Sequence, residues 1–164
     1  MNQKAFAHRK STDKTGAAFE IGRCSTSDVS CLMRMYHDFY PKPASQGLPP
    51  ADFETCQKWA EELIQIGENL LAWHGQEVIG HAALTPDIKG SSGEFVIFVH
   101  QNYRNRGIGT ELAMASLERA RELGFKSVWL TVAITNSIAL RLYVKLGFQS
   151  CAMDECERTM RITL

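Results

Sequence analysis

The sequence lacks the features that mark several large classes of protein. Its 18 Lys and Arg residues balance 18 Asp and Glu residues, so overall charge does not favour a polyanionic partner such as nucleic acid. No apolar run approaches the ~20 residues of a membrane-spanning helix. Residues 1–16, MNQKAFAHRKSTDKTG, contain no apolar core of a secretory signal. We therefore expect a cytoplasmic protein that binds neither nucleic acid nor membrane.

Cysteine is scarce and lacks the spacing of a metal site or a disulfide framework. The five cysteines are odd in number and include no C-x-x-C pair, which indicates reduced thiols that mostly fill the core. The metalloprotease motif H-E-x-x-H is absent, and GSSG at 90–93 is not a G-x-S-x-G nucleophile elbow. We expect no metal.

Length and composition fit one globular domain. The 164 residues are 45% hydrophobic and 22% charged, which is ordinary for a folded domain with a substantial core. Residues 1–16 are polar and without periodicity, and we predict that they form a flexible N-terminal tail. Residues 17–164 form the domain, and neither an internal repeat nor a linker divides them.

Apolar periodicity and turn residues predict an alternation of strands and helices. Four of the five prolines fall at 41–50, PKPASQGLPP, and there they exclude a regular helix and predict a stiff loop. The fold class is α+β, with a mixed, mostly antiparallel central sheet of about seven strands flanked by about four helices. The expected strands are 18–24, 69–73, 77–84, 94–100, 126–133, 148–151 and 158–164, and the expected helices are 29–39, 52–66, 110–123 and 136–146.

Residues 104–109, RNRGIG, lead from a strand into a helix through two glycines. The first N–H groups of a helix lack partners and carry partial positive charge, and glycine lets the main chain approach an anion closely. Arg104 and Arg106 add charge-assisted donors. A helix start that merely contains glycine remains the alternative. Leu112 in the third glycine position excludes a dinucleotide fingerprint, and the lack of G-K-[ST] excludes a P-loop.

Two stretches resemble the GNAT superfamily of N-acetyltransferases. Residues 104–109 are similar to [QR]-x-x-G-x-[GA], with which the family binds the pyrophosphate of acetyl-coenzyme A, and the strand before them has Gln101 where many members have proline. A second signature, N-x-x-A-x-x-x-Y-x-x-x-G-F, is matched by Asn136, Ala139, Tyr143, Gly147 and Phe148. The resemblance covers residues 69–164, whereas residues 17–66 agree in their order of elements alone.

The resemblance implies a GNAT-type fold and an N-acetyltransferase. It implies direct transfer of an acetyl group from acetyl-coenzyme A to a primary amine of a small molecule in a ternary complex, since no cysteine matches a family position for a covalent acyl carrier. The expected partners are acetyl-coenzyme A and the amine acceptor, and a homodimer is left open. The implied cofactor-binding residues are Phe98, Val99, Arg104, Asn105, Arg106, Gly107, Ile108, Gly109, Thr110, Asn136 and Tyr143.

Tyr143 is the candidate general acid. Asn136 and Tyr143 lie seven residues apart, so nearly two helical turns place them on one face. A departing thiolate needs a proton, and tyrosine, with a reference pKa of about 10, remains protonated at neutral pH. The family's oxyanion donor is a main-chain N–H, here near Val99. A core aromatic is the alternative for Tyr143, and a plain helix cap is the alternative for Asn136.

Glu94 is the candidate general base. It lies one residue away from the position at which some family members have a catalytic glutamate, and one residue along a strand turns a side chain to the opposite face of the sheet. A β-bulge in this strand would turn the Glu94 side chain back to the family's face. His81 and His100 are other candidates. A solvated carboxylate at a strand end and structural histidines are the alternative interpretations.

The acceptor pocket is predicted from the family alone. Asp38 or Glu94 beside aromatic walls would suit an apolar amine, although core packing explains the aromatic residues equally well. A protein lysine or N-terminal acetyltransferase and a non-catalytic acetyl-coenzyme A sensor remain alternative functions. The candidate wall residues are Tyr36, Phe39 and Tyr40, with the loop 41–50 and Trp59 or Trp73 beside them.

Overall fold

The computed structural model describes residues 8–41, 49–87 and 91–164. These residues form one eight-stranded sheet in the order β1-β2-β3-β4-β5-β6-β8-β7. Neighbouring strands are antiparallel except β5 and β6, which are parallel. The strands are β1 (Arg9–Thr12), β2 (Ala18–Arg23), β3 (Glu68–His74), β4 (Glu77–Pro86), β5 (Ser92–Val99), β6 (Ser127–Ala133), β7 (Gln149–Met153) and β8 (Glu157–Thr163).

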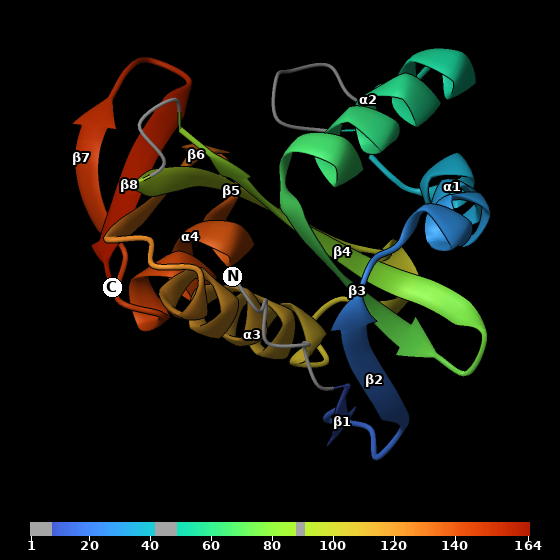
Figure 1. Cartoon of the computed structure of the whole chain (residues 1–164). Coiled ribbons are helices and arrows are strands. Elements are labelled where there is room, and N and C mark those ends of the chain that lie inside the picture. Colours follow the sequence, from blue (N-terminus) through green and yellow to red (C-terminus); the bar gives the residue numbers. More distant parts are fainter. Residues whose placement is uncertain (1–7, 42–48, 88–90) are drawn as a thin grey trace.

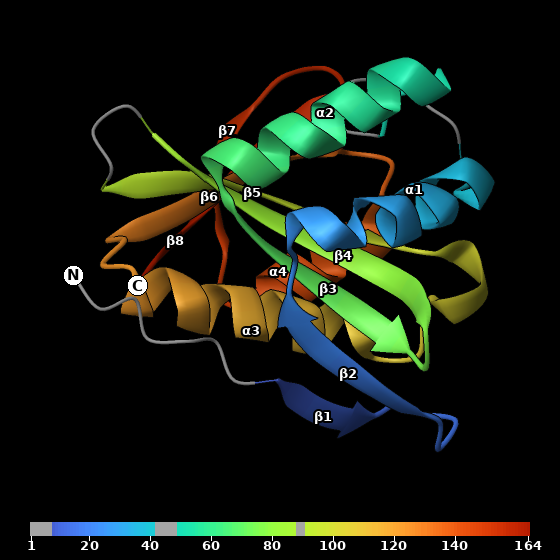
Figure 2. The ribbon, with the colours of Figure 1, turned by 45° about the vertical axis from the view of Figure 1, so that its right-hand side comes forward.

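Helices cover both faces of the sheet. Helices α1 and α2 lie on one face and α3 and α4 on the other (Figures 1 and 2). The helices are α1 (Val29–Asp38), α2 (Phe53–Ile66), α3 (Ile108–Glu122) and α4 (Ser137–Lys145), with short 3-10 turns η1 (Thr26–Asp28) and η2 (Gln101–Tyr103). Among the described residues, no helix is long and apolar enough to cross a membrane.

Each helical layer encloses its own hydrophobic core. Leu112 of α3 packs on the α3/α4 face with Phe95 of β5 and Leu130 of β6. Leu32 of α1 packs on the α1/α2 face with Leu71 of β3. Alternation along each strand sends successive side chains to opposite cores, which explains the runs of apolar residues in the central strands.

Local signals in the sequence explain where the elements begin and end. The Asp52 side chain accepts a hydrogen bond from Thr55 N and caps α2. Gly75, at φ +58°, closes the two-residue hairpin between β3 and β4, as predicted. The first helix, α1, lacks such a cap. Asp28 stands at the N-cap of α1 without a side-chain bond to the helix, and it accepts from Ser25 N instead.

The predicted N-terminal tail is wrong for residues 9–16. Residues Arg9–Thr12 form β1, which pairs with β2 from Arg9↔Ile21 to Thr12↔Ala18, so the sheet has eight strands rather than seven. The strand reads RKST, and its partner supplies its main-chain hydrogen bonds, so its own side chains show no apolar alternation. Residues 1–7, and residues 42–48 of the predicted stiff loop, lie outside the described residues.

Candidate active site

The parallel strands β5 and β6 pair over only three residues each. Ser92–Glu94 pair with Ser127–Trp129, and beyond them β5 continues only along β4 and β6 only along β8. Residues 95–99 and 130–133 therefore face each other without ladder hydrogen bonds. We call this break in the sheet the β5–β6 gap. It lies at the carboxyl ends of two parallel strands, where ligands bind in many α/β sheets.

The register shows which main-chain groups of β5 face the gap. Asp87 N donates to Ser92 O (2.8 Å), and His100 N donates to Ile79 O (2.9 Å). Residues along an antiparallel strand alternate between facing the partner strand and facing away, so the even-numbered residues of β5 bond to β4. The odd-numbered residues whose N–H and C=O groups point into the β5–β6 gap are Phe95, Ile97 and Val99.

Glu94 faces α1 and α2 without any bulge in its strand. The pairing of β4 with β5 is uninterrupted from Gly80↔Val99 to Pro86↔Gly93, so the β-bulge considered for this strand is absent. Phe95 packs in the α3/α4 core and Phe98 in the α1/α2 core. Glu94 therefore shares the face of Phe98, at the point where the gap begins.

The glycine turn, residues 104–109, ends in a helix with free amides. Gly107 is the N-cap of α3 at φ +90°, and Asn105 also has a positive φ of 63°. Thr110 N and Glu111 N both bond to Gly107 O. The N–H groups of Gly107, Ile108 and Gly109 donate to no residue within the described ranges. These amides and the start of the helix dipole form an anion site of the expected kind.

The turn meets both β5 and α4. A Cβ at Gly109 would lie 3.5 Å from Val99 Cγ2 and 3.7 Å from Leu142 Cδ2. Gly109 therefore lies where the end of β5, the start of α3 and α4 come together. The structure thus brings both signature stretches to one end of the β5–β6 gap.

The side chain of Arg104, expected at the pyrophosphate, bonds to other parts of the chain in this structure. Its Nε donates to Val99 O (2.9 Å), its Nη2 donates to Tyr40 O, and its guanidinium lies 5.1 Å from the Phe39 ring centre. Arg104 therefore ties the end of α1 to the end of β5. Arg106 remains half exposed beside the turn, 5.1 Å from the centre of the Tyr103 ring.

Gln101 completes this connection and was missed as a functional residue. Its Nε2 donates to Asp38 O (2.6 Å), and its Oε1 accepts from Tyr40 N (3.0 Å). A proline, the residue common at this position in the family, could make neither bond. We call Gln101 and Arg104, with the backbone of residues 38–40 that they hold, the α1 clasp. The departure from proline was the only signal in the sequence.

Tyr143 and Asn136 stand on α4 as predicted. Asn136 Oδ1 accepts from Ala139 N (3.2 Å), so this residue caps the helix. Tyr143 is 6% exposed, and its ring centre lies 5.6 Å from that of Phe148. Burial raises the pKa of Tyr143 well above its usual value. Its hydroxyl has no hydrogen-bond partner among the described residues and is not fully enclosed.

Most of the expected acceptor wall belongs to the core. Tyr36 and Phe39 are 3% and 4% exposed, and their rings pack edge-on against Phe98. Phe98, expected at the cofactor, has its side chain in this core and its main chain bonded to β4. Trp59 packs into the same cluster, whereas Tyr40 is 67% exposed. Of the three predicted wall residues, only Tyr40 is open to an acceptor.

His81 has a structural role. It is fully buried, and the side chain of Asn69 fixes its tautomer. Asn69 Nδ2 donates to Leu63 O and Gly67 O, so Asn69 Oδ1 must accept from His81 Nε2 (2.8 Å). Nδ1 of His81 then accepts from the Tyr36 hydroxyl (2.5 Å). Burial lowers the pKa of His81 to about 3. A neutral, doubly bonded imidazole cannot serve as a base.

Glu94 is the candidate base that the structure leaves accessible. Burial, together with the charge of Asp87, raises its pKa above the usual value. Trp129, its partner on β6, donates from Nε1 to Asp87 Oδ1 (3.3 Å).

His100, the other candidate base, caps η2 by accepting from Asn102 N (3.4 Å), and it is 8% exposed. Among the described residues, no cluster of His, Cys, Asp or Glu could hold a metal ion.

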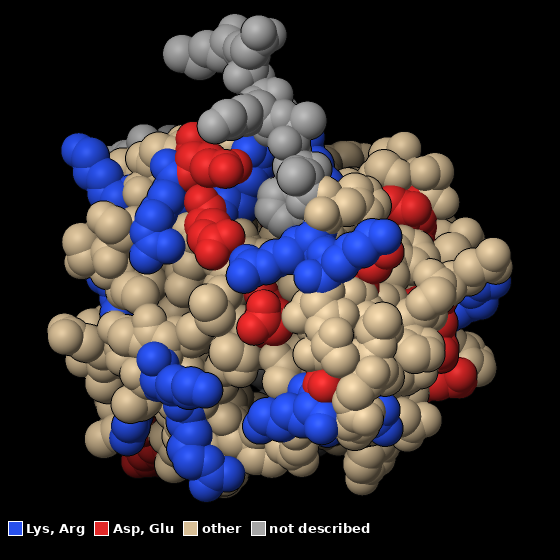
Figure 3. Space-filling model, turned by 90° about the horizontal axis from the view of Figure 1, so that it is seen from below, with Lys and Arg blue, Asp and Glu red and all other residues tan. Residues whose placement is uncertain are grey.

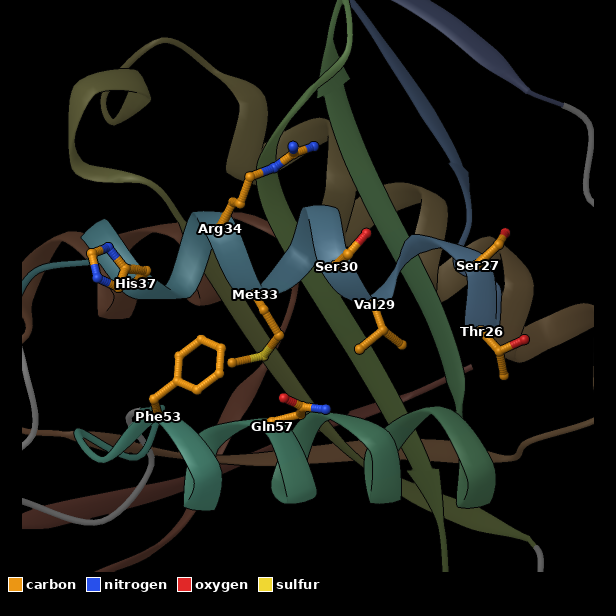
Figure 4. A pocket seen from close by; sticks show the side chains of 9 residues that line it. All are labelled: Thr26, Ser27, Val29, Ser30, Met33, Arg34, His37, Phe53 and Gln57. Carbon is orange, nitrogen blue, oxygen red and sulfur yellow. The ribbon is translucent and has the colours of Figure 1, made fainter.

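A groove of about 560 Å³ between α1 and α2 is separate from this site. Figure 4 shows Met33 and Val29 of α1 facing Gln57 and Phe53 of α2 across it. Neither the glycine turn nor β5 contributes a lining residue. The groove is a space between two helices on the outer side of the domain.

Known proteins resemble the chain in sequence. A mycothiol acetyltransferase from Parafrankia sp. is 35% identical over 156 residues, which are 87% of this chain and 48% of that protein. An L-methionine sulfoximine/L-methionine sulfone acetyltransferase from Pseudomonas paraeruginosa is 27% identical over 136 residues, 79% of each chain. The chain spans about half the length of the mycothiol acetyltransferases that it matches.

Solved structures share the fold. The GNAT domain of S. lividans PAT superposes with a TM-score of 0.79 at 14% identity, covering 96% of this chain and 97% of that one. The protein yncA from Salmonella typhimurium, determined with its cofactor acetyl-CoA, gives a TM-score of 0.72 at 17% identity, covering 89% and 94%. The model of the acetyltransferase (GNAT) family matches residues 31–148, which include both signature stretches. The chain belongs to the GNAT acetyltransferase family.

Proposed function

We propose that the protein is an acetyl-coenzyme A-dependent N-acetyltransferase that acts on the primary amine of a small molecule. The observation that carries this proposal is the β5–β6 gap, which leads from the free amides of the glycine turn to the face that holds Glu94. Transfer would be direct, within a ternary complex of cofactor and acceptor.

The residues present fit acetyl-coenzyme A. Its pyrophosphate would lie on the amides of Gly107, Ile108 and Gly109, where the dipole of α3 favours negative charge. Its pantetheine arm carries amides of its own, and it can pair with the outward-facing N–H and C=O of Ile97 and with the N–H of Val99, as a short extra strand would; the C=O of Val99 already accepts from Arg104. Filling the gap in this way would satisfy main-chain groups that no strand partner reaches.

The chemistry then needs three roles. The amine nitrogen attacks the thioester carbonyl carbon and forms a C–N bond, and the carbonyl oxygen becomes an oxyanion. An N–H of β5 that faces the gap, at Val99 or Ile97, stabilises this oxyanion. As the C–S bond breaks, the Tyr143 hydroxyl donates its proton or a hydrogen bond to the thiolate. A raised pKa keeps this tyrosine protonated throughout the neutral range.

Glu94 is the proposed acceptor of the amine's proton. Glu94 lies three positions along the strand from Ile97, a span of about 10 Å at roughly 3.3 Å per residue, so the proton would pass through water. Its carboxyl faces the acceptor side, and its raised pKa brings it nearer to the pH at which it works. Activity would then fall as the pH drops through this raised pKa, because the protonated carboxyl cannot accept a proton.

A small acceptor is favoured by the relatives and by the site. The names of two relatives, a mycothiol acetyltransferase and an L-methionine sulfoximine/L-methionine sulfone acetyltransferase, refer to small molecules. Partly buried Trp129 lies beside the carboxylates Glu94 and Asp87 and offers aromatic surface next to negative charge. An amine can use both, through apolar contact and ion pairing.

Release of coenzyme A thiol, measured over a panel of amines, tests this function. The panel should include L-methionine sulfone, a polyamine, a lysine peptide and a peptide with a free N-terminus. We expect turnover on at least one small amine, and a loss of about tenfold or more in acetyl-coenzyme A affinity for Gly109→Val. Turnover on peptides alone would favour a protein acetyltransferase. Tight binding without turnover of any amine would indicate a sensor.

A further inference from the structure

The N-terminal hairpin, residues 9–23, lies against the helix that begins at the glycine turn. Arg9 reaches Glu118 (3.2 Å) and Glu111 (3.6 Å) on α3. Figures 1 and 2 show β1 beside α3, at the edge of the sheet far from β7. Figure 3 shows Lys and Arg side chains next to Asp and Glu side chains on the face seen from below, which includes α3. The hairpin is therefore held on the α3 side of the molecule.

Asp13 shapes the turn of this hairpin. Its Oδ1 accepts from Thr15 N (2.8 Å), Thr15 Oγ1 (2.6 Å) and Ala17 N (3.0 Å). Its side chain is 3% exposed, and its Oδ2 lies 3.7 Å from Arg106 Nη1. The hydrogen bonds from Thr15 lower the pKa of Asp13, so the carboxylate stays charged at neutral pH. One buried carboxylate thus organises the hairpin turn and faces an arginine of the glycine turn.

The next residue brings a second cation to the glycine turn. Lys14 N donates to Arg106 O (3.0 Å). The Lys14 side chain runs beside Gly107, with two of its carbons 3.8 Å from where a Cβ of Gly107 would lie. Within the described ranges, Lys14 forms no ion pair. Its position is fixed at the main chain while its charge remains unneutralised.

The cation expected at this turn is used elsewhere. The guanidinium of Arg104 donates hydrogen bonds to Val99 O and Tyr40 O, as part of the α1 clasp. Two further cations lie beside the free amides of Gly107–Gly109: Arg106, which faces Asp13, and Lys14. Arg106 stands at a variable position within the family motif, and Lys14 lies outside the residues 31–148 that the family model matches.

We propose that the turn of the N-terminal hairpin, residues 13–17, is part of the coenzyme A site, with Lys14 as a phosphate ligand and Asp13 as the residue that positions Lys14 and Arg106. This inference rests on the proposed function. The ammonium of Lys14 binds a phosphate of coenzyme A, either the pyrophosphate or the 3′-phosphate. Asp13 holds the turn so that Lys14 and Arg106 approach the same anion from two sides.

Calorimetric titration with coenzyme A and with 3′-dephospho-coenzyme A tests the role of Lys14. Lys14→Ala should raise the Kd for coenzyme A about two- to fivefold, and Lys14→Glu about tenfold, because repulsion then replaces attraction. The effect should shrink as salt is added. If Lys14 binds the 3′-phosphate, its substitution leaves the Kd for the dephospho form unchanged. If it binds the pyrophosphate, both ligands weaken alike.

Lys10 supplies the matched control. It lies on the same hairpin, is 84% exposed and pairs with Glu20 at 3.6 Å, and it has no contact with the glycine turn. Lys10→Glu makes the same change in net charge and should leave both Kd values near those of the parent. Equal weakening by Lys10→Glu and Lys14→Glu would mean that long-range charge alone acts, and it would overturn the inference.

Asp13→Asn tests positioning separately from folding. The amide oxygen can still accept from Thr15 and Ala17, whereas the charge that faces Arg106 is lost. We expect a raised KM for acetyl-coenzyme A with kcat preserved, and a midpoint of thermal unfolding close to the parent's. A parent protein that binds coenzyme A while the Lys14 and Asp13 variants bind it equally well would overturn this inference alone. A parent that does not bind coenzyme A would overturn the proposed function and this inference with it.

Discussion

Arg104 shows that a residue of a binding motif can also hold parts of the fold together. The motif places an arginine ahead of two glycines, and charge alone would assign it to the pyrophosphate. The structure turns its guanidinium toward two carbonyl oxygens and the Phe39 ring, because the end of α1 lies within its reach. Main-chain amides remain the common element of the motif, and the charges around them come from other parts of the chain.

The Tyr143 hydroxyl decides whether the family's acid can be assigned to this chain. Tyr143→Phe keeps the ring that packs on Phe148 and removes only the hydroxyl, which has no described partner in the free protein. Stability should therefore barely change. We expect kcat to fall by about 10- to 1,000-fold while affinity for acetyl-coenzyme A stays near the parental value.

A second acyl donor sharpens this test. An acetyl thioester of a more acidic thiol needs less proton donation, so the defect of Tyr143→Phe should shrink with that donor. Parental rates with every donor and amine would leave Tyr143 as a core aromatic, and the acid would be water or another group.

His81 should make the protein less stable in mild acid. Its pKa is about 3 in the folded chain, below the usual 6.5, so the unfolded chain binds this proton first as the pH falls. Its contribution to stability is fully present above pH 6.5 and is lost as the pH falls toward 3. The slope for one proton is about 1.4 kcal/mol per pH unit.

Urea unfolding of the parent and of His81→Gln between pH 4 and pH 8 measures this effect. Glutamine should cost stability at neutral pH, since it disturbs the bonds to Tyr36 and Asn69. The gap in unfolding free energy between the two proteins should narrow below pH 6.5, because only the parent has the histidine to protonate. A constant gap would show that His81 keeps an ordinary pKa.

At the scale of elements, the α1 clasp joins the acceptor side to the cofactor side. Gln101 and Arg104 both follow β5 and both hold the backbone that follows α1. Gln101→Ala removes two hydrogen bonds, each worth about 1 kcal/mol, and frees the exposed Tyr40 beside the acceptor face. We expect a raised acceptor KM and a smaller change in the KM for acetyl-coenzyme A.

Asn102→Ala is the control for the clasp. Asn102 is the exposed neighbour of Gln101 in η2, and its side chain makes no hydrogen bond to the described residues. Its substitution should leave both KM values unchanged. If Gln101→Ala behaves in the same way, the clasp fastens the fold but does not shape the acceptor site.

Periodicity and glycine predicted the elements well because both act locally. The helical spacing of Leu32 and Tyr36, and the turn at Gly75, follow from a few neighbouring residues. The strand β1 could not be predicted in this way, because RKST is polar and its pairing comes from β2. A strand at the edge of a sheet can be specified by its partner alone.

The sequence predicted which elements carry the candidate site residues better than it predicted where their side chains point. Sequence spacing put the two signature stretches on the correct elements, and they meet at Gly109, as the contacts of its missing Cβ show. It could not tell that Arg104 turns toward α1, that Tyr36 bonds to His81 or that Lys14 runs beside Gly107. Each of these depends on a contact between residues far apart in the chain, which only the packed fold provides.

On the scale of the whole molecule, two blocks of sheet meet at the β5–β6 gap. Strands β1 to β5 form one block and β6, β8 and β7 form the other, joined by three residue pairs and by the core beneath α3 and α4. A ligand that fills the gap would bond to the edge of the first block and pack against the second. Binding should therefore stabilise the fold as a whole, by about 2.7 kcal/mol at a ligand concentration of 100 Kd.

Amide hydrogen exchange read residue by residue tests this arrangement most directly. In the free protein, the N–H groups of Val96 and Phe98 bond to β4, whereas those of Ile97 and Val99 face the gap without a strand partner. We expect Ile97 and Val99 to exchange faster than their even-numbered neighbours. Acetyl-coenzyme A should slow these two amides selectively, since they gain partners while the bonds to β4 stay as they were. Uniform protection along β5 in the free protein would mean that the gap is closed in solution, and the cofactor would then have to bind elsewhere.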